Sequence, residues 1–91
     1  MYNISDVTLQ INERFFAAVA SLKKQRLLGG LKGFSERYNV VLGNLYTIKT
    51  RKRGAVKAEY LHFLVVDYGL SAEWLLTGKG GMFIQMSAKT E

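Results

Sequence analysis

The sequence contains no cysteine and no proline, and it has a single histidine and a single tryptophan. Without cysteine, neither a disulfide framework nor a thiolate metal site can form, so we expect a protein of the reducing cytoplasm. His62 has no second candidate ligand at a spacing such as H-x-x-x-H, and no metal site is expected. Without proline, we expect glycine to mark the ends of helices and the turns.

Long apolar runs are also missing. No segment approaches the ~18 apolar residues of a membrane span, and the first residues, MYNISDV, lack the basic and apolar regions of a signal peptide. We therefore expect neither membrane insertion nor secretion. The scattered carboxylates form no paired acids or nucleophile-base pair, and TGKGG lacks the full spacing of a P-loop. Neither an enzyme nor a small-molecule cofactor is expected.

What the sequence does contain is one domain's worth of apolar residues and an uneven charge. Its 91 residues are 48% hydrophobic, enough for one compact core. The net charge is +6, and it is unevenly distributed. Residues 31–57 contain seven basic residues and one acidic residue, whereas residues 58–91 contain two basic and four acidic residues. Such a concentration is typical of a surface that binds a polyanion, and a solvated basic face is the alternative.

Apolar residues at helical spacing predict five helices. These cover residues 9–26, residues 31–38, the first part of the stretch 42–53, residues 56–68, and a short segment between Ser71 and Gly78. The pair Gly29-Gly30 is expected to end the first helix, and Gly69 the fourth. Ser71 is the expected N-cap of the fifth, which carries Trp74 as a core anchor.

Residues 39–41 join the second and third predicted helices at the spacing of a helix-turn-helix unit. The segment 31–82, especially FSERYNVVLGNLYTIKTRKR followed by DYGLSAEWLLTGKGGM, resembles the lambda-repressor-like helix-turn-helix domain of phage repressors and Xre-type bacterial regulators. The resemblance implies a compact all-α domain of five helices, here residues 1–81, followed by a short tail over residues 82–91. It also implies that the third helix enters the major groove of double-stranded DNA, usually within a homodimer.

The third predicted helix begins with residues that carry no hydrogen-bonding side chain. With Leu45 and Ile48 directed inward, the 100° helical step directs outward the residues Gly43, Tyr46, Thr47 and Thr50, and leaves Leu42 and Asn44 at the flanks. Gly43 then gives clearance for the backbone, and Leu42 packs on its neighbours or touches a thymine methyl. The predicted base-reading set is Leu42, Gly43, Asn44, Tyr46 and Thr47.

Basic residues follow this helix directly. We expect Thr50, Arg51, Lys52, Arg53 and Lys57 in the loop that leaves it, and Lys32 near the start of the second helix, all contacting DNA phosphates. Val41 stands where this family commonly has a Ser or Thr N-cap. A β-branched apolar residue cannot cap, so either the first turn of the helix frays or Asn39 caps it from two residues earlier.

These features favour a sequence-specific DNA-binding regulator of the phage or mobile-element repressor kind. The alternative is a protein-interaction module or antitoxin-like partner binder that keeps the fold. Leu42 and Gly43 at reading positions favour this alternative, and the basic loop opposes it. The tail holds Met82, Phe83, Ile84 and Met86, which we expect to form a homodimer contact together with the fifth helix. Folding back over the first or fourth helix of the same chain is the other possibility.

Overall fold

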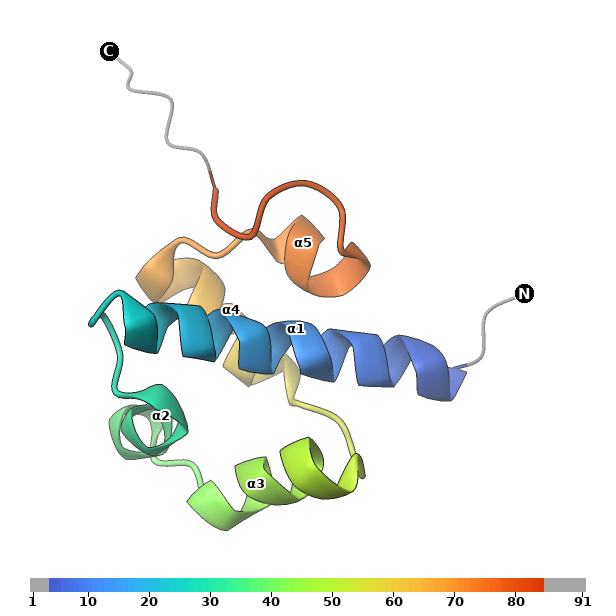
Figure 1. The fold of residues 1–91 in the computed structure, drawn as a ribbon, viewed down its shortest axis with the longest axis horizontal. Helices are drawn as coiled ribbons and strands as arrows, with labels where there is room; N and C mark the ends of the chain where they lie inside the picture. The colour runs from blue at the N-terminus through green and yellow to red at the C-terminus, as the bar shows by residue number, and fades with distance from the viewer. Residues whose placement is uncertain (1–3, 85–91) are drawn as a thin grey trace.

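A computed structural model of the protein describes residues 4–84 and shows one long helix with shorter helices around it (Figure 1). The helices are α1 (Ile4–Lys24), α2 (Gly30–Tyr38), α3 (Leu42–Arg51), α4 (Ala58–Tyr68) and α5 (Ala72–Thr77). An isolated antiparallel bridge between Leu70 and Phe83 is the one element of β-structure within residues 4–84. The predicted all-α class is therefore confirmed.

The bounds of α1 differ from the prediction at both ends. The helix begins at Ile4 rather than near Leu9, and Asp6 lies in its first turn, where its carboxylate faces the positive end of the helix dipole. It ends at Lys24, because Arg26 adopts a left-handed conformation with φ 63°. The N–H of the next residue, Leu27, then donates to the carbonyl of Leu22 at 2.9 Å. Arg26, and not the Gly29-Gly30 pair, therefore ends the helix.

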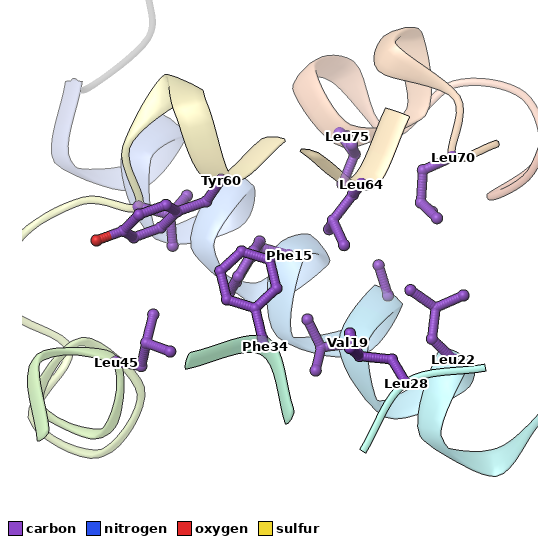
Figure 2. Packing of buried hydrophobic residues seen from close by; sticks show 12 residues of the cluster. Phe15, Val19, Leu22, Leu28, Phe34, Leu45, Tyr60, Leu64, Leu70 and Leu75 are labelled. Atoms are coloured by element: carbon purple, nitrogen blue, oxygen red, sulfur yellow. The ribbon is translucent and has the colours of Figure 1, made fainter. Parts of the chain in front are cut away.

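The hydrophobic core lies between α1 and the other four helices (Figure 2). Phe15 of α1 is fully buried, and its ring meets the ring of Phe34 of α2 edge-on, with the ring centres 5.3 Å apart. The ring centre of Tyr60, on α4, lies 5.7 Å from that of Phe34 and 6.0 Å from that of Phe15. These aromatic contacts hold α1, α2 and α4 together. Leu45 of α3 and Leu75 of α5 are buried in the same core.

Helix α5 has only six residues and depends on contacts at both of its ends. As predicted, Ser71 is its N-cap, and the Ser71 hydroxyl accepts a hydrogen bond from the N–H of Trp74 at 3.1 Å. Gly78 ends the helix in a left-handed conformation. The guanidinium of Arg14, on α1, donates to the carbonyls of Leu75 and Leu76 at 2.9 and 3.0 Å. These last bonds fix the C-terminal end of α5 to α1.

The end of α2 is held against α4 by Tyr38. The Tyr38 ring stacks on Phe63 with their centres 4.0 Å apart and their planes nearly parallel. Its hydroxyl accepts a hydrogen bond from Arg37 Nε and donates one to Asp67 Oδ2. Burial and the bond to Asp67 both raise the pKa of Tyr38, so the phenol stays protonated and remains a donor. Asn39 then turns the chain in a left-handed conformation.

Two glycine positions with open space beside them allow a matched test of helix design. A Cβ added at Gly43 in α3 or at Gly69 after α4 would meet no atom within 4 Å, but only Gly69 has a positive φ, of 72°. Gly43→Ala should raise the free energy of unfolding by about 0.5–1 kcal/mol, because alanine has the higher helix propensity. Gly69→Ala should lower it by about 1–2 kcal/mol. Urea denaturation of both variants measures this, and changes of the same sign would contradict it.

Candidate nucleic-acid interface

Helix α3 buries one face and exposes the other. Leu45 is fully buried, and Leu42 and Ile48 are half-buried against the core, whereas Gly43, Asn44, Tyr46 and Thr47 are exposed. The predicted inward direction of Leu45 is confirmed. Leu42 packs on its neighbours, which is the first of the two roles expected for it. The exposed face of α3 is therefore available to a partner.

The exposed face of α3 has a different side chain on each flank. Tyr46 borders the hollow between α1, the start of α2 and α3. Asn44 borders a separate hollow beside the start of α4. Gly43 and Thr47 lie between these flanks, and Gly43 opens directly onto free space. Tyr46, predicted to point outward, thus lies at the edge of this face, while Asn44 lies at a flank as predicted.

The two threonines of α3 bond to their own helix. Thr47 Oγ1 donates to the carbonyl of Gly43 at 2.9 Å, and Thr50 Oγ1 donates to the carbonyl of Tyr46 at 2.8 Å. A hydroxyl that donates in this way still offers its oxygen as an acceptor. Thr47 can therefore accept a hydrogen bond from a base without giving up its contact with the helix.

The first turn of α3 has no side-chain cap. Its N-cap is Val41, in an extended conformation and without a capping bond, as the apolar side chain predicts. Asn39, the other candidate, is instead the left-handed C-cap of α2, and its N–H donates to the carbonyl of Ser35. The N–H of Asn44 donates to the carbonyl of Val41 at 3.1 Å, and the N–H groups of Leu42 and Gly43 before it are left to water or to a partner.

The residues predicted to contact phosphates are exposed, but two of them lie elsewhere than predicted. Thr50 and Arg51 belong to the last turn of α3 rather than to the loop, because Lys52 ends the helix in a left-handed conformation with φ 54°. Lys52, Arg53 and Lys57 lie in the connection between α3 and α4, and Lys32 lies in the first turn of α2. All of these side chains are exposed.

Two further lysines lie beside this face and were not in the predicted set. Lys23 of α1 and Lys49 of α3 border the same hollow as Tyr46. Lys49 follows Tyr46 by three residues, one helical turn, so its place beside Tyr46 could have been inferred from spacing. The place of Lys23 could not, since it depends on the packing of α1 against α2 and α3.

Other candidate sites are not assembled in the described part of the chain. Within residues 4–84, no three His, Asp or Glu side chains lie close enough together to hold a metal ion. No helix in the same range is long and apolar enough to cross a bilayer. His62 is exposed with its ring edge-on to Phe63 at 5.9 Å, and Trp74 is half-buried against the core, as expected.

The chain matches no protein-family model. It likewise matches no curated protein and no solved structure. Function is therefore inferred from the charge, exposure and geometry of the residues described above, together with the motifs of the sequence.

Proposed function

We propose that this protein is a sequence-specific double-stranded DNA-binding regulator of the lambda-repressor-like helix-turn-helix type, which represses transcription by occupying an operator. The observation that carries the proposal is the placement of positive charge around α3. The exposed face of α3 ends in Arg51, and the exposed connection after it adds Lys52, Arg53 and Lys57. A helix with basic side chains concentrated at one end suits a DNA groove whose edges are lined by phosphates.

In this mechanism, phosphate contacts and base contacts come from different residues. Arg51, Lys52, Arg53 and Lys57 contact the backbone at one end of α3, and Lys32 contacts it from α2. Gly43 lets the helix approach the floor of the major groove, since no side chain stands between. Asn44 and Tyr46 on the flanks, with Thr47 between them as an acceptor, then meet the edges of the bases.

A protein-interaction module or antitoxin-like partner binder is the second candidate. It is favoured by Val41, which is 65% exposed directly before α3, and by the lack of a polar side chain at Gly43. An apolar leading end suits a protein groove as well as a thymine methyl group. The cluster of exposed basic side chains after α3 favours DNA as the partner, because a helix that docks into an apolar protein groove needs no such positive charge.

The first prediction from this proposed function concerns the salt dependence of DNA binding. With five or six phosphate contacts, each adding ~0.9 to the slope, log K for duplex DNA should fall with log salt at a slope of about −5. The double variant Arg51→Ala, Arg53→Ala should make the slope shallower by ~2 and weaken specific and non-specific DNA alike. The matched control, Lys24→Ala with Lys79→Ala, removes the same charge from exposed sites on α1 and after α5. A slope near zero for the natural protein would remove DNA binding from consideration.

A second prediction tests clearance at Gly43. Gly43→Gln should fold, since its side chain enters free space, but it should bind the operator at least tenfold more weakly because the longer side chain keeps the helix from the groove. Asn44→Ala and Tyr46→Ala should instead change the preference for particular bases by ~1–3 kcal/mol. Binding-site selection from a random DNA pool, followed by titration, measures both effects. Equal or tighter operator binding by folded Gly43→Gln is incompatible with clearance.

A third prediction concerns the homodimer. Met82 and Phe83 are half-buried against the core of their own chain, and Met86 lies outside the described residues. Ile84 is still 50% exposed, and so is Leu76 on α5. We therefore expect the dimer contact at Ile84 and α5, which would place two recognition helices ~34 Å apart.

Sedimentation at tens of micromolar decides this. The natural protein should run as a dimer and prefer a palindrome to a half-site, while Ile84→Asp should run as a monomer and lose that preference. Leu27→Asp, at a 56% exposed position after α1, is the control and should remain dimeric. A monomeric natural protein that binds both DNAs equally would exclude the dimer.

A further inference from the structure

Asn12 is a polar residue on the otherwise apolar buried face of α1. Its side chain is almost fully buried, at 3% exposure, and lies one turn from Phe15. Both ends of its amide bond to backbone far along the chain. Nδ2 donates to the carbonyl of Gly54 at 3.0 Å, and Oδ1 accepts from the N–H of Val56 at 2.9 Å. Asn12 thus joins α1 to the connection between α3 and α4.

That connection has few other attachments. From Lys52 to Lys57 every residue is exposed except Val56, whose side chain enters the core. Lys52 and Gly54 both have a positive φ, of 54° and 79°, so the backbone turns at both residues while it is largely surrounded by solvent. The buried side chain of Val56 and the amide of Asn12 are therefore what fixes this segment to the domain.

The pattern of bonds indicates that Asn12 positions backbone rather than fills space. An apolar side chain would serve burial better, because a buried amide gains little unless each of its polar groups is bonded. Here the donor and the acceptor are each matched to one backbone group of the same short segment. Such a two-point contact fixes the direction of the segment as well as its distance from α1.

We propose that Asn12 is the positioning residue that holds Lys52, Arg53 and Lys57 where they contact DNA phosphates. This inference rests on the proposed function and adds a residue that itself touches no DNA. Because the backbone of the connection is already ordered in the free protein, binding has only the side chains left to order. Releasing the connection should therefore reduce both affinity and the number of phosphates contacted.

The test compares Asn12→Leu with Ser35→Ala. Leucine has a similar size but leaves the Gly54 carbonyl and the Val56 N–H without their partner. Ser35 is the other buried polar residue within residues 4–84, at 8% exposure, and its hydroxyl bonds only to the carbonyl of Lys32 in its own helix. Removing it alters a buried polar group without touching the connection.

With a short duplex of mixed sequence as the probe, Asn12→Leu should bind about tenfold more weakly than the natural protein, and its salt slope should be shallower by about 1–2. Ser35→Ala should keep the natural slope. In the absence of DNA, the amide hydrogen of Val56 should be protected from exchange in the natural protein and in Ser35→Ala, and should lose that protection in Asn12→Leu.

The outcomes separate the inference from the proposed function. A folded Asn12→Leu with an unchanged slope overturns the positioning role while the natural protein's own steep slope leaves DNA binding intact. A natural protein with no salt-dependent binding overturns both. If Asn12→Leu does not fold, the natural protein still decides: a Val56 amide that exchanges as fast as an unstructured peptide overturns the positioning role.

Discussion

The packing of Phe15 against Phe34 and Tyr60 is the contact on which the rest of the structure depends. It joins α1, α2 and α4 at one point, and Figure 1 shows α1 crossing the middle of the domain with α2 and α3 on one side and α5 on the other. A domain of this size has one small core, so each element must reach the same few side chains. Helix α1 is the longest element, and it supplies the surface on which the shorter helices assemble.

The shorter helices are too short to persist alone. Helices of nine, ten and six residues, as α2, α3 and α5 are, need tertiary contacts because nucleation is costly and few internal bonds follow it. Helix α3 meets this need with little burial, since Leu45 is its one fully buried residue. The remainder of its surface is thereby free to contact a partner. The same need for tertiary contacts explains why Arg14 and Tyr38 form hydrogen bonds to residues near the ends of neighbouring helices.

Local sequence patterns predicted much of this fold. Ser71, Gly69 and Gly78 act at the positions that their cap and turn chemistry indicates, because each rule involves only neighbouring residues. The left-handed residue Arg26 was not predicted, since a non-glycine at that position carries no local signal. The contacts of Asn12 and Arg14 were missed for a different reason. Their partners lie 42 to 62 residues away, and no spacing rule connects them.

The two ends of α3 are built differently, and this difference fits the proposed division between residues that contact DNA bases and residues that contact phosphates. Its leading end has an exposed apolar N-cap, no capping bond and a glycine, all of which weaken a helical turn. Its trailing end continues into a connection fixed by Val56 and by the amide of Asn12. Phosphates repeat regularly along any duplex, so contacts to them are best made from a rigid segment. The edges of the bases differ from one DNA sequence to the next. A first turn of α3 that can shift slightly can accommodate these differences while the C-terminal end of the helix stays in place.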